Sequence, residues 1–245
     1  PDYIAKHVAL RIAGVTQEYS IADYIAEHGQ PQLVMRQGLQ TLNLSMKKIT
    51  SLFGMDALSV RNQVQHLMLG FNFLYAIALD AQQPTQPFDG FAQLQRLDLS
   101  YNQLNNLPEG VFAGLEQLQW LNLSANQLNN LPGGVFAGLA QLQWLYLSLN
   151  QLNNLPEGVF AGLAQLQELD LADNRLNNLP AGVFASLGQL QRLELYDNQL
   201  NNLPEGVFAG LGQLHSLYLV GNLLSEEEKE RIRERLPANI VVEFE

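Results

Sequence analysis

Leucines recur along the middle of the chain with a period of 24 residues. From Leu94 to Gln213, five consecutive units carry leucine at positions 1, 4, 6, 11, 14 and 22, asparagine at 9, proline at 15 and phenylalanine at 19. Positions 4 and 6 alternate with more polar neighbours, which predicts a short half-buried strand in each unit. A fixed period of this length indicates a solenoid, in which each unit buries its apolar side against the next one.

One strand per unit predicts a parallel sheet that grows by stacking, with the leucines forming a continuous core. The asparagines at position 9 are expected to bond to backbone groups of the turns, because buried backbone groups need partners. The phenylalanines at position 19 should stack as a second spine near the outer wall. Glycines after the proline and near the end of each unit favour tight turns or 3₁₀ pieces over a long helix.

Two irregular units precede the regular ones. Leu39 begins the first, with Lys47 at its ninth position, so the asparagine ladder is expected to start at Asn72 in the second. That second unit has 30 residues, with its extra residues near 78–83 and with Phe88 in phase with the phenylalanines. The insertion is either a tolerated surface loop or a contact loop.

The two ends depart from the repeat. Residues 1–38 have helix-like apolar spacing over 2–13 and 20–28, with Ser20 as an N-cap. We expect these helices to cover the open edge of the first strand, or else to dock a partner. Residues 214–245 form a last unit and a C-terminal cap: Ser225 and Glu228 have capping-box spacing, and 240–244 reads as a final strand. The repeats then span 39–213.

The recurring string L-x-x-L-x-L-x-x-N-x-L resembles the leucine-rich repeat family, and the extension L-P-x-G-V-F-x-G-L is similar to repeats of Toll-like receptors, variable lymphocyte receptors and bacterial relatives. The resemblance implies an α/β solenoid: a horseshoe with a concave parallel sheet of about eight strands, a helical N-terminal cap and a helix-strand C-terminal cap. Vertebrate extracellular relatives usually have disulfide-bonded caps. This chain has 0 cysteines, which favours a bacterial, intracellular or engineered origin.

The units differ mainly at positions 3, 5, 7 and 8, whereas positions 2, 12 and 13 are constant in the regular units. Positions 3, 5 and 7 project from the side of the strand opposite the leucines, which is the concave side, and position 8 follows directly. We therefore predict a variable binding surface there. Its candidate residues are His66, Met68, Phe71, Arg96, Asp98, Tyr101, Trp120, Asn122, Trp144, Tyr146, Leu149, Glu168, Asp170, Asp173, Arg192, Glu194, Tyr196, Asp197 and Tyr218.

This surface has an aromatic centre and an acidic flank. Tyr101, Trp120, Trp144 and Tyr146, with Leu149, form the centre, and aromatic side chains dominate interface hot spots. The alternative is that the tryptophans only stack on each other and on a neighbouring arginine. Toward the C-terminus, carboxylates face each other across strands at a cost of about 0.2–1 kcal/mol per pair, which suggests a cationic partner. A merely solvated acidic face is the other interpretation.

The composition argues against several other functions. The net charge is −11 and the basic residues are not clustered, which disfavours nucleic acid and membrane partners. No apolar run approaches the length of a membrane span. The four histidines are spread along the chain, and no catalytic, metal or cofactor motif is evident. Sequons at Asn43 and Asn122 fall on the predicted binding surface, so we expect no glycans there.

The sequence therefore predicts a non-enzymatic monomer that binds a protein partner with a basic surface. The rivals are a carbohydrate-binding module with tryptophan platforms, a consensus-like or engineered scaffold without a natural ligand, and the recognition part of a bacterial effector.

Overall fold

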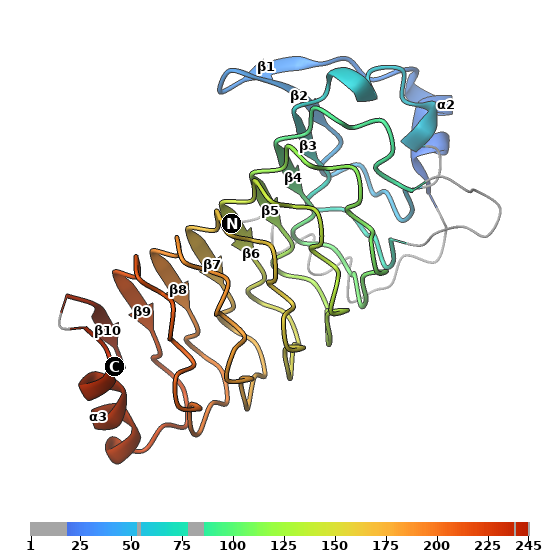
Figure 1. The fold of residues 1–245 in the computed structure, drawn as a ribbon. Coiled ribbons are helices and arrows are strands. Elements are labelled where there is room, and N and C mark those ends of the chain that lie inside the picture. The colour runs from blue at the N-terminus through green and yellow to red at the C-terminus, as the bar shows by residue number, and fades with distance from the viewer. Residues whose placement is uncertain (1–18, 53–54, 78–85, 238, 245) are drawn as a thin grey trace.

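The computed structural model describes residues 19–52, 55–77, 86–237 and 239–244. Within them the chain forms a solenoid in which the strands stack in chain order and the connecting loops lie on the opposite side (Figure 1). The helix expected over 2–13 and the insertion near 78–83 fall outside the described residues. No helix in the described part of the chain has the length and apolar character to cross a lipid bilayer.

The strands form one ten-stranded sheet in the order of the sequence. Every neighbouring pair is parallel except β1 and β2, so the predicted stack of eight parallel strands corresponds to β2–β9, with one further strand from each end of the chain. The strand bounds are β1 Val34–Arg36, β2 Leu39–Asn43, β3 His66–Met68, β4 Arg96–Asp98, β5 Trp120–Asn122, β6 Trp144–Tyr146, β7 Glu168–Asp170, β8 Arg192–Glu194, β9 Ser216–Tyr218 and β10 Val241–Glu243.

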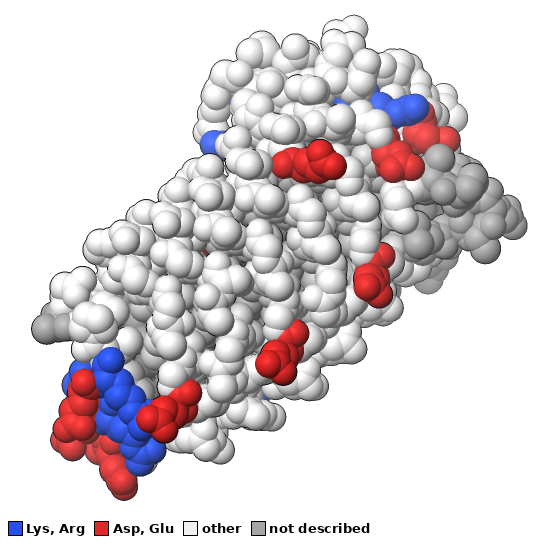
Figure 2. Space-filling view, in the orientation of Figure 1, with Lys and Arg blue, Asp and Glu red and all other residues white. Residues whose placement is uncertain are grey.

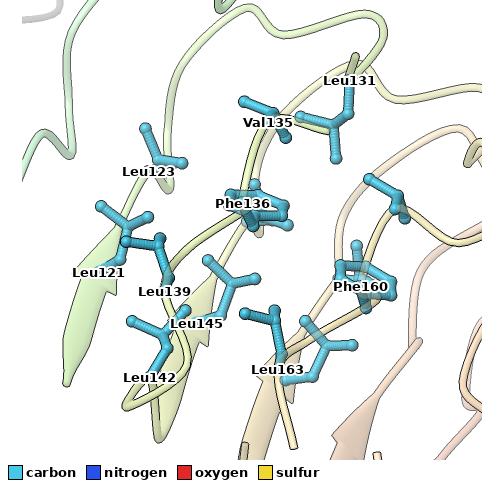
Figure 3. Close-up of a cluster of buried hydrophobic side chains, with 14 of the residues drawn as sticks. Leu121, Leu123, Leu131, Val135, Phe136, Leu139, Leu142, Leu145, Phe160 and Leu163 are labelled. Atoms are coloured by element: carbon cyan, nitrogen blue, oxygen red, sulfur yellow. The ribbon is translucent and has the colours of Figure 1, made fainter. Parts of the chain in front are cut away.

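The core is a continuous column of leucines flanked by the phenylalanine spine (Figure 3). The middle leucine of each strand β3–β9 is fully buried, while its two neighbours in the strand are half-buried. Phe88, Phe112, Phe136, Phe160 and Phe184 stack with centroids 6.1–6.3 Å apart. Offset stacking at this spacing adds to the burial energy of each ring. The predicted spine is confirmed from Phe88, in the irregular unit, to Phe184, whereas Phe208 stacks on no ring of the described residues.

The asparagine ladder is also confirmed, and it starts at Asn72 as predicted. Each side-chain amide donates to the carbonyl of the leucine at position 6 in its own unit and in the preceding unit. Asn126, for example, donates to Leu123 and Leu99, both at 3.0 Å. Each side-chain oxygen accepts an N–H from the turn of the preceding unit, as Asn126 does from Leu104 at 3.0 Å. The ladder thus ties neighbouring units together where the backbone leaves the strands.

Tight turns on the outer side complete each unit. The Pro-x-Gly-Val-Phe segment closes with i→i+3 bonds, for example Val135 N–H to Pro132 O at 3.1 Å and Leu139 N–H to Phe136 O at 3.2 Å. The first irregular unit has two 3₁₀ helices, η1 Met55–Ala57 and η2 Arg61–Gln63. The prediction of short turns and 3₁₀ pieces instead of long helices therefore holds.

At the N-terminal end, α2 covers Ile21–His28 and begins with the predicted Ser20 cap. Ser20 Oγ accepts the Asp23 N–H at 3.1 Å, and the Asp23 carboxylate accepts the Ser20 N–H at 2.7 Å. The helix lies against η1, however, and not on the sheet edge. The edge of β2, which the sequence assigns to helical cover, is paired by β1 instead through a two-residue hairpin turn at Gln37 and Gly38. Their φ angles of 51° and 79° match the left-handed turn that two-residue hairpins prefer.

At the C-terminal end, α3 covers Glu226–Arg235 and β10 pairs with β9, as the pattern predicts. Ser225 Oγ accepts the Glu228 N–H at 3.2 Å, but the reciprocal half of the expected capping box is absent from these residues. The Glu228 carboxylate is buried and accepts the N–H of Leu203 at 3.1 Å, and it pairs with Arg231 at 2.8 Å. It therefore joins the helix to the last regular unit. Figure 2 shows that charged side chains gather over this end of the molecule in that view.

Candidate binding surface

The concave face of β3–β9 brings the candidate residues of positions 3 and 5 together in two rows. The strands pair in register, so Trp120 lies beside Trp144 and Asn122 beside Tyr146. In each of these strands the central leucine points into the core and its two neighbours stay partly exposed. One wall of the solenoid thus holds His66, Met68, Arg96, Asp98, Trp120, Asn122, Trp144, Tyr146, Glu168, Asp170, Arg192, Glu194 and Tyr218.

Position 8 has a backbone conformation that the sequence reading missed. In every unit from β2 to β9 this residue has a φ between 49° and 70°, which is the left-handed region. Most non-glycine residues adopt this region at a cost of about 1–2 kcal/mol. In the units of β2 to β8 its N–H donates across to the next unit, as Leu149 does to Ala172 O at 3.1 Å, so the turn is held in this form. The local signals are Gly221 in the last unit and Asp173 and Asp197 before it, because glycine and then aspartate adopt this region most readily. The residues concerned are Met46, Phe71, Tyr101, Ala125, Leu149, Asp173, Asp197 and Gly221.

Position 5 has a structural function in part of the units. The side-chain oxygens of Asp98, Asn122 and Asp170 accept the backbone N–H two residues later, at 2.9–3.0 Å. Local bonds of this kind are a common use of aspartate and asparagine at turns. The carboxylates of Asp98 and Asp170 therefore stabilise the end of their own strands, in addition to any contact with a partner. The units with methionine, tyrosine or glutamate at position 5 have no side chain suited to this bond.

The aromatic residues divide into two groups. Trp120 packs against Tyr146 with ring centroids 5.8 Å apart and an interplanar angle of 54°. Tyr101 instead stacks on Phe71 at 4.2 Å, next to the N-terminal part of the face. Arg96, expected beside the tryptophans, donates to Gln37 Oε1 at 2.9 Å in the β1–β2 turn. Trp144 is half-buried, and Leu149, at position 8 of the same unit, is 48% exposed.

Arg192 offsets part of the negative charge of the acidic flank, but its ion-pair partner is not the one that strand pairing predicts. Arg192 neighbours Glu168 across the strands, but its guanidinium pairs with Glu194 on its own strand and lies over the Tyr218 ring at 4.5 Å. Burial raises the pKa of the Asp170 carboxyl, and the charges of Glu194 and Glu168 raise it further, against hydrogen bonds from Ser148 and Ala172.

Repulsion between carboxylates also affects the residues at positions 7 and 8. Burial and then the charge of Asp197 raise the pKa of Asp173. Burial and the surrounding carboxylates, Asp170 first, raise the pKa of Tyr196. These side chains therefore lie in the negative electrostatic potential of the surrounding carboxylates, which Arg192 does not cancel. A cation placed over them would stabilise the ionised carboxylates of Asp170, Asp173 and Asp197.

The N-terminal end of the face has the opposite charge. Burial, followed by repulsion from Arg96 and Arg36, lowers the pKa of His66 to about 4. His66 is therefore neutral at physiological pH, beside two cationic side chains. The concave wall thus runs from a basic end near β3 through aromatic rings to an acidic end near β8.

No group of three or more His, Asp or Glu side chains in the described ranges is arranged to hold a metal ion. Two pockets lie beside the candidate carboxylates, one of about 280 Å³ next to Glu168 and one of about 450 Å³ next to Asp173 and Asp197.

Stacked parallel strands, a buried asparagine ladder and variable side chains on a concave wall define a solenoid repeat protein. A family model described as Leucine rich repeat matches residues 62–128, 123–176 and 164–224. These matches cover more than half of the chain, so the chain belongs to the leucine-rich repeat family.

Solved structures with the same fold include a bacterial protein and a receptor. A leucine-rich repeat protein of Leptospira interrogans is 34% identical with a TM-score of 0.62, over 76% of this chain and 50% of that one. TLR13, in the crystal structure of a TLR13–ssRNA13 complex, is 28% identical with a TM-score of 0.58, over 76% of this chain and 29% of that one. The chain thus spans half or less of the length of these proteins. No match is found among curated proteins.

Proposed function

We propose that this chain is a protein-recognition module that binds its partner on the concave face of β3–β9. The observation that supports this most is the location of the differences between the copied units: the half-exposed residues at positions 3 and 5, in register across the sheet. Leucine-rich repeat proteins commonly bind other proteins, and a rigid sheet loses little conformational entropy when it does so.

The charge distribution supports a partner with apolar and basic contact residues. The aromatic centre around Trp120, Trp144 and Tyr146 supplies anchors of the kind that dominate interface energies. Next to it, the carboxylates of Asp170, Asp173 and Asp197 attract a basic surface. We propose that apolar contacts of the partner meet the rings while its lysines or arginines meet the acidic flank. The basic residues near β3 then disfavour the reversed orientation.

Two other ligand classes fit less well. TLR13 is seen with ssRNA13, but the present chain has a net charge of −11, which opposes a phosphate backbone. A carbohydrate could stack on the tryptophans, but it would gain little from the acidic flank. The effect of carboxylate removal on binding therefore separates a basic protein from a neutral glycan.

The test is affinity capture with the wild-type chain and two matched variants, followed by titration of the purified captured protein. Trp120→Ala with Trp144→Ala should reduce affinity at least tenfold, while Asn153→Ala with Asn177→Ala, on the constant outer row, should leave it unchanged. Asp173→Asn with Asp197→Asn should weaken binding mainly at low salt.

The outcomes discriminate clearly. If the outer-row variant loses the captured protein and the tryptophan variant keeps it, the concave face is not the binding surface. If a glycan array gives a ligand that depends on the tryptophans but not on the two aspartates, the chain is a carbohydrate-binding module.

A further inference from the structure

The phenylalanine spine ends abruptly at the C-terminal cap. Phe112, Phe136, Phe160 and Phe184 each have a stacked ring at about 6.2 Å and are at most 1% exposed. Phe208 is the last in the series and is only partly buried, although its side chain packs on the core. Unlike the other phenylalanines at this position, it forms no stacked pair with another ring of the described residues.

A cavity of about 500 Å³ lies against this end of the spine. Its walls come from the outer turn of the last regular unit and from the inner side of α3 with the segment that follows it. The apolar lining includes Leu203, Val207, Phe208, Leu211, Ile232 and Leu236. A cavity of this size and character is typical of a small-molecule site. It lies on the loop side of the solenoid, away from the concave wall of the proposed protein interface.

The repeat explains the shape of this cavity. Leu214 is position 1 of the last unit, so Ile232 falls at position 19, where every regular unit has phenylalanine. Here α3 replaces the outer turn, and the smaller Ile232 side chain, although buried, does not fill the layer that a further ring would occupy. The space thus lies beside Phe208, in the layer where the repeat pattern would place one more phenylalanine.

The charged residues of the lining favour a neutral occupant. Glu228 already accepts the Leu203 N–H and pairs with Arg231. The two remaining ionisable groups, Glu205 and Arg235, have opposite charge. An isolated cation or anion would therefore meet one like charge for each unlike one and would still lose its hydration. An uncharged ring loses neither and gains the stacking energy that the spine rings gain.

We propose that this cavity is a binding site for a small uncharged aromatic molecule whose ring packs against Phe208, at the layer where Ile232 replaces the phenylalanine of the regular units. The proposal is independent of the concave-face function, because it involves different residues on the opposite side of the repeats. Free ligand would stabilise the C-terminal cap by mass action, since it binds the folded chain only.

The experiment compares benzyl alcohol with cyclohexylmethanol, which has a similar shape and the same hydroxyl but no aromatic ring. Binding to the full chain is followed by chemical-shift changes of the Val207 and Ile232 methyl groups. We expect benzyl alcohol to bind at least fivefold more tightly than cyclohexylmethanol. Ile232→Phe should fill the layer, raise the melting temperature and reduce benzyl alcohol binding at least tenfold, whereas Trp120→Ala on the concave face should leave it unchanged.

Phe208→Leu is a second variant, for the case that Ile232→Phe does not fold. It keeps an apolar wall but removes the ring, so the preference for benzyl alcohol over cyclohexylmethanol should disappear. The proposal is overturned if the wild-type chain binds neither probe up to its solubility limit, if it binds both equally, or if Ile232→Phe folds and binds benzyl alcohol as the wild type does.

Discussion

The asparagine ladder gives a stability prediction that can be worked bond by bond. Asn150 is buried in the middle of the ladder. Its side-chain amide donates to the carbonyls of Leu123 and Leu147, both at 3.0 Å, and of Ser148 at 3.2 Å. Its side-chain oxygen accepts the Leu128 N–H at 3.0 Å. Asn150→Ala removes all of these bonds at once.

The carbonyls keep other partners, which limits the cost. Leu123 O still accepts from Asn126, and Leu147 O from Asn174 at 3.0 Å. The Leu128 N–H, in contrast, loses its side-chain acceptor inside the protein. One orphaned buried donor costs about 1–3 kcal/mol, and the lost bonds add to this, so we expect a total loss of about 3 kcal/mol in the free energy of unfolding.

The matched control is Asn222→Ala at the C-terminal end of the ladder. Asn222 makes the same type of bonds, but it is only half-buried, so water can replace its side chain. We expect a loss of about 1 kcal/mol there. Urea unfolding followed by circular dichroism measures both, provided that the slope of free energy against urea is unchanged. Equal losses for the two variants, or a loss below about 1 kcal/mol at Asn150, would refute the bond-by-bond argument.

Three further predictions concern the concave wall. Asp170→Asn keeps an oxygen for the Ala172 N–H but removes a carboxylate whose pKa is raised in the folded state. The folded state favours the protonated carboxyl of Asp170. Its contribution to the free energy of unfolding is complete below the ordinary carboxyl pKa and is lost as pH rises through the raised pKa. The variant should therefore be more stable than wild type at pH 7 by up to about 1 kcal/mol, and the difference in urea midpoint should vanish near pH 4. The ring protons of His66 should titrate near pH 4 instead of 6.5 in NMR spectra, so His66→Gln should flatten the loss of stability as pH falls through this interval; a midpoint above 6 would contradict its burial beside two arginines. Leu149→Gly relieves the left-handed backbone at φ 55° and should change thermal stability by less than about 1 kcal/mol, whereas the β-branched Leu149→Val should destabilise clearly more; the reverse order would refute the strain.

The features that the sequence predicted well are those repeated in every unit. The strand positions, the leucine column, the ring spine and the asparagine ladder depend only on a residue and its copies 24 positions away. Nearest-neighbour stacking is the dominant interaction in a solenoid, so a periodic pattern fixes it without knowledge of distant contacts. For the same reason Phe88 could be assigned to the spine across an irregular unit.

The candidate surface was predictable only in part. The alternation along the strand places positions 3 and 5 on the concave wall, and the structure agrees. The side-chain partners on that wall were not predictable, because a long side chain can reach several neighbours on adjacent strands. Thus Arg96 bonds to Gln37 from the terminal hairpin, and Arg192 pairs with Glu194 and not with Glu168.

The sequence by itself determined that this chain is a leucine-rich repeat solenoid whose differences are confined to a few positions per unit. The tertiary structure decided three other properties. Backbone bonds between units hold position 8 in a left-handed form, for which Gly221 is a weak local signal. The strand β1 pairs with the sheet edge because unpaired backbone groups of β2 select a strand over a helix. The cavity beside Phe208 exists because α3 replaces an outer turn, and only packing between these two segments determines how much space remains.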